Sequence, residues 1–190
     1  MKFSINYLYL SFYIISVFMS IYLNNIFYLI IMLCFTIFYM LKDKNYIELF
    51  KWNNKHYKEN TRYIIFFFVL LIFSACYGYK SFSLNYIKYK FFEFLLIVFL
   101  VPFIEELIFR VILFESIKVN EEFHFILLNS FQTLIFIMIH FIVNKGYYGI
   151  LVINLAYING QIYFTEKNFL KMYGLHSIYN FIALIFTIQW

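Results

Sequence analysis

Two adjacent glutamates, Glu105 and Glu106, stand in an almost entirely apolar stretch between Phe91 and Phe114, and Arg110 follows one helical turn later. An ionised carboxylate near the centre of a bilayer costs about 2.5 to 3.5 kcal/mol on insertion scales, so each glutamate needs a partner, a cavity or a chemical task. In a helix, Glu106 and Arg110 lie on one face and can form an ion pair, whereas Glu105 is rotated by about 100°. We therefore expect Glu106 to be neutralised and Glu105 to stay available.

Two histidines and an asparagine stand in other apolar runs of the chain. His140 ends the run FQTLIFIMIH, where Phe136 lies four residues earlier on the same helical face and its ring could pack beneath the imidazole. His176 and Asn180 share a face in GLHSIYN, which presents a ring N–H and an amide side by side. Polar groups from three separate helices could thus converge on one wet pocket.

Each of these polar residues also has a purely structural interpretation. An intramembrane histidine or asparagine often serves only to join helices by a hydrogen bond. Glu106 and Arg110 could be a buried structural ion pair, and a small transporter or proton-relay subunit would use the same buried carboxylates. The joint pattern of the three groups is what favours a catalytic site.

Together the three groups resemble the CPBP or Abi family of intramembrane proteases, which includes CAAX prenyl endopeptidases and bacteriocin-processing proteins. Its ordered motifs are E-E-x-x-x-R, F-x-x-x-H and H-x-x-x-N/D, and all three occur here in that order. The resemblance extends from Phe91 to Phe186. The chain departs from the family at the position after the motif arginine, where a glycine is usual, and at the bulky positions before the second-motif histidine. These departures are Val111, Ile137, Met138 and Ile139.

The resemblance implies a glutamate-dependent endopeptidase. In such an enzyme, Glu105 would act as general base on a water that His140 also holds. His176 and Asn180 would stabilise the oxyanion. Peptide hydrolysis needs both functions, a group that takes a proton and fixed donors where negative charge develops on the carbonyl oxygen. Three further residues would support the site, namely Glu106, Arg110 and Phe136.

A metal cofactor is a second possibility that the resemblance raises. Members are commonly described as metalloproteases, and Glu105, His140 and His176 could ligate zinc as such residues do in zinc hydrolases. However, the motif H-E-x-x-H is absent from the chain, and no two histidines share a helix face at ligand spacing. The sequence therefore favours a water mechanism without a metal, with zinc as the alternative.

The composition places these residues in a membrane protein. Of the 190 residues, 64% are hydrophobic and 26% aromatic, with a single proline, which excludes a soluble domain and a disordered chain. Apolar runs near the spanning length recur along the chain, so we expect an all-α, polytopic transmembrane bundle of about seven helices, within a range of about six to eight. The net charge of +5 is spread over the loops and suits a membrane surface rather than nucleic acid.

This bundle is expected to be one membrane-embedded domain over residues 1–190, with a motif-bearing core at 91–188. The predicted spans lie near residues 7–23, 26–41, 63–79, 91–114, 123–143, 147–164 and 169–188. A basic stretch between Lys42 and Arg62 predicts a cytoplasmic N-terminus by the positive-inside tendency. An excess of Phe, Tyr, Ile, Asn and Lys suits an AT-rich genome and indicates a bacterial cell membrane.

Pro102 lies three residues before the glutamates and removes a backbone donor there. The span could be broken at Pro102, with a new helix that sets both glutamates near a positive dipole end, or it could be one long kinked helix. Strict alternation of uninterrupted spans would place Glu105 toward the inside of the membrane and His140 toward the outside. For these two side chains to meet, one segment must be broken, tilted or re-entrant.

We therefore predict a multi-pass membrane protease whose partners are the lipid bilayer and a peptide or membrane-protein substrate. Bacteriocin or signal-peptide precursors are the favoured substrates, and self-immunity is a related task. A non-catalytic immunity or binding protein that sequesters a peptide toxin is the main alternative. The transporter or proton-relay subunit is a third.

Overall fold

The computed structural model describes residues 57–77, 91–114, 122–144 and 149–186, with residues 11, 15, 19, 30, 34, 36 and 37 as isolated positions. These four stretches are helical apart from a two-residue turn, and no strand occurs within them, in agreement with the predicted all-α class. Apart from these isolated positions, the predicted spans near 7–23 and 26–41 lie outside the described residues. Within the part of the chain that is described, no helix combines the length and the hydropathy that crossing a membrane requires. The number of spans stays a prediction.

Five long helical segments make up the described fold. They are α4 (Tyr57–Tyr77), the segment Phe91–Phe114, α9 (Glu122–Asn144), α10 (Gly149–Glu166) and α11 (Phe169–Phe186). The last four agree within two residues with the predicted spans at their positions. In contrast, α4 begins six residues before its predicted start at 63, because its polar first turns are held by hydrogen bonds from Asn60 that hydropathy does not detect.

The segment that carries the glutamates is continuous through Pro102. Along the chain it consists of α6 (Phe91–Leu95), the π-helical turn η1 (Leu96–Leu100), α7 (Val101–Glu106) and a second π-helical turn η2 (Leu107–Ile112). Leu100 and Val101 both have right-handed helical dihedral angles, which supports the continuous helix of the two alternatives. The glutamates therefore lie in a helix interior. A π turn ahead of a proline is one way in which a helix accommodates the missing N–H.

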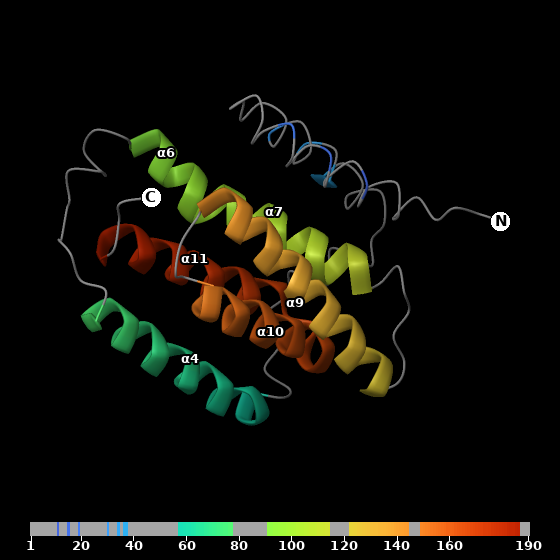
Figure 1. Cartoon of the computed structure of the whole chain (residues 1–190). Helices are drawn as coiled ribbons and strands as arrows, with labels where there is room; N and C mark the ends of the chain where they lie inside the picture. The colour runs from blue at the N-terminus through green and yellow to red at the C-terminus, as the bar shows by residue number, and fades with distance from the viewer. Residues whose placement is uncertain are drawn as a thin grey trace.

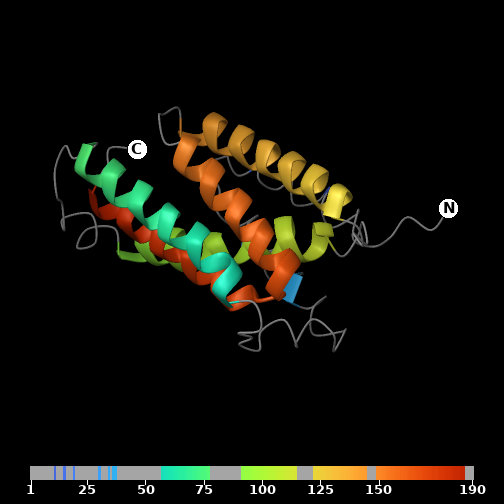
Figure 2. The same ribbon diagram turned by 90° about the horizontal axis from the view of Figure 1, so that it is seen from below.

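The helices that carry the three motifs are neighbours in space. Figure 1 and Figure 2 both show α10 between α9 and α4, and α10 packs on each of them. In Figure 1, α11 lies between α4 and the Phe91–Phe114 segment, and it contacts both. Neither the segment nor α9 is interrupted, so the motifs are brought together by the packing of whole helices.

A two-residue turn at Lys167 and Asn168 joins α10 to α11. Lys167 has a φ of 50°, in the left-handed region that commonly ends a helix, and its N–H donates to the Tyr163 carbonyl over 3.0 Å. Asn168 then caps the next helix, because its side-chain oxygen accepts from the N–H of Lys171 over 3.1 Å. This short connection fixes where α11 begins and hence the position of His176.

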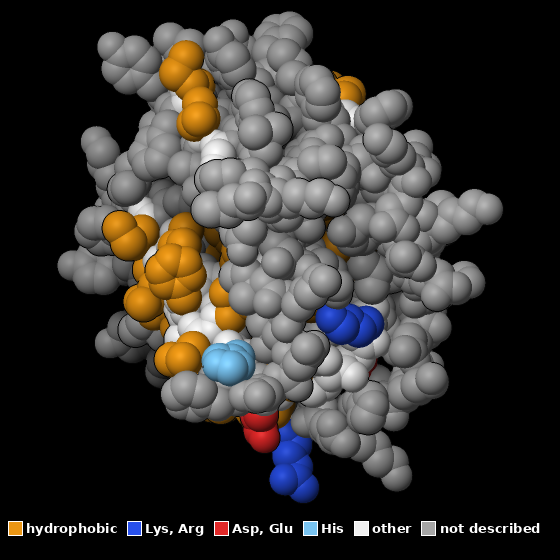
Figure 3. All heavy atoms as spheres, turned by 90° about the vertical axis from the view of Figure 1, so that its right-hand side faces the viewer, with side chains coloured by type: hydrophobic (Ala, Val, Ile, Leu, Met, Phe, Trp, Pro, Cys, Tyr) orange, Lys and Arg blue, Asp and Glu red, His pale blue; other side chains and the backbone are white. Residues whose placement is uncertain are grey.

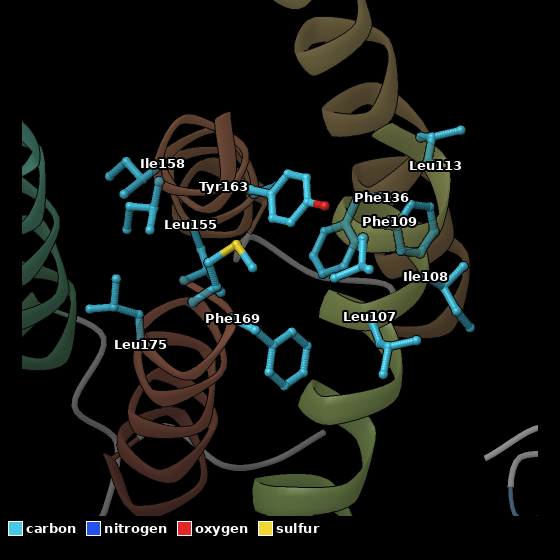
Figure 4. Packing of buried hydrophobic residues seen from close by; sticks show 14 of the residues in the cluster. Leu107, Ile108, Phe109, Leu113, Phe136, Leu155, Ile158, Tyr163, Phe169 and Leu175 are labelled. Carbon is cyan, nitrogen blue, oxygen red and sulfur yellow. The ribbon is translucent and has the colours of Figure 1, made fainter. Parts of the chain in front are cut away.

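The core lies where α9, α10 and α11 meet the Phe91–Phe114 segment. Aromatic side chains supply much of its volume, and Phe109, Phe136 and Tyr163 are each at most 1% exposed. Figure 4 shows Phe109 and Phe136 side by side, with the ring of Tyr163 directed toward them from α10. The motif helices are thus packed against each other through well-filled apolar contacts.

Apolar side chains also cover outer faces of the bundle. On α4 and α9 they recur every three or four residues, which places each set on one face of its helix. Figure 3 shows apolar side chains gathered along one side of the molecule, with the described charged side chains toward one end. The two sets, each member more than half exposed, are Phe66, Val69 and Ile72 on α4 and Phe131, Leu134 and Met138 on α9.

Candidate active site

His176 and Glu106 form the central contact of the site. Nδ1 of His176 lies 2.7 Å from Oε1 of Glu106, and both side chains are buried. Since a carboxylate only accepts hydrogen bonds, Nδ1 carries the proton and donates it to Glu106. This bond joins α11 to the Phe91–Phe114 segment.

Glu106 also pairs with Arg110 on its own helical segment. Oε2 of Glu106 lies 3.2 Å from Nε of Arg110, and neither side chain is exposed. The guanidinium in turn donates from Nη2 to the Ala156 carbonyl of α10 over 3.0 Å. The ion pair expected from the spacing of four residues is therefore present, and it links three helical elements.

Glu105 faces the other ring nitrogen of His176. Its Oε2 lies 3.6 Å from Nε2, beyond the length of a hydrogen bond. Both atoms are buried, and neither has a hydrogen-bond partner within the described part of the chain. A buried polar atom without a partner costs about 1–3 kcal/mol, so an oxygen that contacted both atoms from the side would gain hydrogen bonds that the described residues do not supply.

Phe136 of α9 packs against side chains from all three motifs. Its ring centroid lies 4.3 Å from that of His140, as expected for residues four apart, and 5.7 Å from that of His176. The guanidinium carbon of Arg110 lies 4.9 Å from the same centroid, within cation–π range. Phe109 adds an edge-on ring contact at 5.4 Å. Phe136 therefore supports more of the site than the imidazole of its own helix.

His140 is oriented by the backbone of α9. Its Nδ1 lies 2.9 Å from the Phe136 carbonyl oxygen, and because a carbonyl only accepts, Nδ1 is the protonated nitrogen and Nε2 remains as an acceptor. Glu105 is the charged group that acts most strongly on His140, although no hydrogen bond joins the two among the described residues. The acid and this imidazole therefore belong to one electrostatic site.

Asn180 lies one turn beyond His176 on α11. Its Nδ2 donates to the carbonyl oxygen of Ile97 over 2.8 Å, so one of its two N–H donors is bound to the backbone of η1. Ile97 lies eight residues before Glu105. Of the two residues expected to stabilise an oxyanion, His176 thus lies beside Glu105, whereas the amide of Asn180 is bound elsewhere on the segment.

Buried amides of α9 and α10 extend the site beyond the three motifs. Gln132 donates from Nε2 to the Ala156 carbonyl over 3.1 Å and to Oδ1 of Asn129 over 2.7 Å. The same Ala156 carbonyl also accepts from Arg110. Asn159 donates to the Met172 carbonyl over 3.2 Å. Sequence reasoning missed these residues. The available signal was the presence of polar amides inside apolar runs, and Asn129 and Gln132 also stand at helical spacing before the motif phenylalanine.

A second buried ion pair, also missed, lies at the turn between α10 and α11. Nζ of Lys171 lies 2.7 Å from Oε1 of Glu166, and Asn60 of α4 donates to the same oxygen over 2.7 Å. Asn60 also donates to Oγ1 of Thr165 over 2.7 Å. The pair spans a turn, so its spacing of five residues gives no helical signal in the sequence.

The donor set expected for a metal was Glu105, His140 and His176. Within the described residues, no group of three or more His, Cys, Asp and Glu side chains is arranged to hold a metal ion. Nδ1 of each of these histidines is bonded to an oxygen, which leaves Nε2 as the ring nitrogen that could bind a metal. As these described side chains are placed, the three do not converge on one metal position.

Residues 87–182, half of the chain, match the sequence model of a family described as Rce1-like, type II CAAX prenyl endopeptidase. The match contains all three motifs and confirms the family resemblance predicted from them. No curated protein and no solved structure gave a match to the chain.

Proposed function

Because the chain belongs to the Rce1-like family of type II CAAX prenyl endopeptidases, a family of membrane proteases, we propose that it hydrolyses peptide bonds with Glu105 as general base. The observation that carries this proposal is the pair of buried atoms Oε2 of Glu105 and Nε2 of His176, which face each other over 3.6 Å without hydrogen-bond partners. An oxygen that approached this pair from the side could contact both the carboxylate and the imidazole.

In the proposed reaction, Glu105 takes a proton from a water as the water oxygen attacks the carbonyl carbon of the peptide. His140 accepts a second hydrogen bond from this water at Nε2, the ring nitrogen that its bond to the Phe136 carbonyl leaves as an acceptor. The protonated Glu105 then delivers its proton to the peptide nitrogen, the C–N bond breaks, and the amine leaves. The same carboxylate thus takes the proton from the water and returns it to the amine.

His176 is proposed to stabilise the negative charge that develops on the carbonyl oxygen. Its Nδ1–H is held by Glu106, so Nε2 is the nitrogen that faces the reacting groups. Nε2 is a donor only in the imidazolium form, and the oxyanion role therefore requires protonated His176. Glu106, which Arg110 fixes from the other side, holds the ring in this orientation.

A multi-pass location in the cell membrane is part of the proposal. It is supported by the exposed apolar faces of α4 and α9, where Phe66 and Leu134 are 55% and 60% exposed. Contiguous apolar surface of this kind is unusual in a protein surrounded by water and is expected where lipid covers it. The proposed substrates are correspondingly apolar peptides and peptide precursors, such as bacteriocin precursors, that reach the site from the bilayer.

Peptide cleavage by matched glutamate variants tests the proposal. Wild type, Glu105→Gln and Glu93→Gln would be purified in one detergent and incubated with fluorogenic precursor peptides and a farnesylated CAAX peptide, with and without a strong chelator. Glu93 is exposed on the same helical segment and controls for loss of a charge. We expect cleavage by wild type and by Glu93→Gln, and a loss of about 10²–10⁴-fold for Glu105→Gln.

The other outcomes separate the alternatives. Cleavage that survives Glu105→Gln would remove this residue as the base, and cleavage abolished by the chelator would require a metal. A toxin-protection assay in cells addresses the immunity protein, because protection that persists in normally expressed Glu105→Gln indicates binding without catalysis. Proton flux into liposomes that vanishes in Glu105→Gln, with no peptide cleaved, would indicate a relay subunit.

A further inference from the structure

The carbonyl of Ile97 is left without a donor by the helical ladder around it. The N–H of Val101, which would bond to Ile97 in an α-helix, donates instead to the Leu96 carbonyl five residues back. A π-helical ladder would supply the N–H of residue 102, but this residue is Pro102 and has none. Neither pattern of hydrogen bonding therefore satisfies Ile97 from within the segment.

Asn180 supplies the missing donor from another helix. Its Nδ2 lies 2.8 Å from the Ile97 carbonyl oxygen, at good hydrogen-bond length. Asn180 follows His176 by four residues, so both side chains leave α11 on one face toward the Phe91–Phe114 segment. His176 reaches Glu105 and Glu106, and Asn180 reaches the backbone two turns earlier.

We propose that Asn180 is a positioning residue that replaces the amide donor absent at Pro102 and thereby holds Glu105 at its distance from Nε2 of His176. Two bonds from one face of α11, to Ile97 and to Glu106, fix both the position of the segment along α11 and its rotation. Without the Asn180 bond, the His176–Glu106 bond is the one of these two that remains, and the Phe91–Phe114 segment can shift about it. The catalytic part of this inference rests on the proposed function.

A double-mutant cycle of Asn180→Ala and Pro102→Ala tests the proposal. An alanine at position 102 restores an N–H, and either helical pattern then gives the Ile97 carbonyl a donor without Asn180. In the wild-type background, we expect Asn180→Ala to lower kcat about 10- to 100-fold, the range for a slight misplacement of a catalytic group, with KM changed by less than about twofold. In the Pro102→Ala background, the same substitution should lower kcat by less than about threefold.

Equal losses of kcat in the two backgrounds would overturn the proposal, because an asparagine that contacts the oxyanion is needed whatever residue stands at position 102. A loss expressed mainly in KM would overturn it as well. The split between kcat and KM, measured on folded protein, also distinguishes positioning from a general loss of stability.

The unfolding temperatures of the same four proteins test the hydrogen bond without any assay of activity. Asn180→Ala should lower the unfolding temperature by about 2–4 °C in the wild-type background and by clearly less in the Pro102→Ala background. Equal shifts in the two backgrounds would refute the hydrogen bond.

If Asn180→Ala does not fold, recovery of folded protein in the double variant supports the proposal, and no recovery counts against it. If wild type cleaves no peptide, the proposed function is refuted, but the role of the Asn180 hydrogen bond is not. The unfolding temperatures of the four proteins still decide whether Asn180 supplies the donor for Ile97.

Discussion

His176 donates its Nδ1 proton to Glu106 over 2.7 Å, and this bond decides which nitrogen of the ring faces Glu105. The two adjacent glutamates consequently have different environments. Glu106 is enclosed by an imidazole and a guanidinium, whereas Glu105 has a buried oxygen without a hydrogen-bond partner in the described structure. The roles of the two should therefore separate experimentally.

Glu106→Gln should destabilise the protein much more than Glu105→Gln does. It removes the partner of Arg110 and leaves a guanidinium buried beside a neutral amide, and breaking a buried ion pair in this way costs about 3–5 kcal/mol. Glu105→Gln disturbs no hydrogen bond of Oε2 and should keep the wild-type unfolding temperature within a few degrees. Thermal unfolding of the three proteins in one detergent measures the difference. Similar losses in both variants would contradict this division of roles.

Phe136→Ala should lower both stability and turnover. The ring is fully buried and contacts side chains from all three motifs, so its removal leaves a cavity that costs about 3–5 kcal/mol and loosens both histidines. Phe131→Ala, on an exposed face of the same helix, is the matched control and should leave unfolding nearly unchanged in detergent. Chemical denaturation and kcat of the two variants check the prediction. An effect of Phe131→Ala as large as that of Phe136→Ala would argue against it.

Gly160→Ala and Gly174→Ala should have opposite effects. A Cβ at Gly160 of α10 would overlap Oδ1 of Asn129, a buried side chain that is held by the Tyr157 carbonyl. We expect a loss of about 1–3 kcal/mol, as for other overpacked positions. At Gly174 of α11 a Cβ meets no atom within 4 Å, and better helix propensity should raise stability by up to about 1 kcal/mol.

The matched pair of glycine variants is compared by unfolding temperature. Adding Asn129→Ala to Gly160→Ala should recover part of the loss, because the overlapping oxygen is then gone. A stable Gly160→Ala variant would mean that α9 and α10 do not approach as closely here as the structure shows.

Lys171→Met should destabilise the protein while sparing the chemistry of the folded fraction. It removes the ammonium that pairs with the buried carboxylate of Glu166, at a cost of about 3–5 kcal/mol. Lys167→Met is the control, because the ammonium of Lys167 is exposed and rests on the ring of Tyr163, so its loss should matter little. Unfolding temperature, together with kcat per folded molecule, distinguishes a structural role of the Lys171–Glu166 pair from a role in the proposed reaction. A lower kcat in folded Lys171→Met would show that the turn also positions catalytic groups.

Sequence reasoning singled out the residues of the candidate site because these polar residues interrupt apolar runs. The pairing of Glu106 with Arg110 and the stacking of Phe136 under His140 both follow from a separation of four residues in one helix, and the structure contains both contacts. The bounds of the motif-bearing helices were predicted within two residues for the same reason, since apolar runs end where polar residues begin. Such features depend only on residues close in sequence.

Contacts that depend on tertiary packing were not predictable in this way. The bond from Asn180 to Ile97 requires a π turn, and no side-chain pattern marks where a helix changes its winding. The approach of Asn129 to Gly160 depends on how α9 and α10 meet. The early start of α4 depends on Glu166, more than a hundred residues away, which accepts from Asn60.

The two π turns also bear on how related chains should be aligned. Each accommodates one residue more than the α-helical turn that it replaces, and the turns flank the glutamates on both sides. A helical wheel drawn with uniform spacing across Phe91–Phe114 therefore assigns residues beyond either turn to the wrong face. A relative that lacks one residue within Leu96–Leu100 would form an ordinary α-helix in this stretch. Its acidic pair would still face the same imidazole. A single-residue gap there should therefore be read as a change of helical pitch and not as loss of the motif.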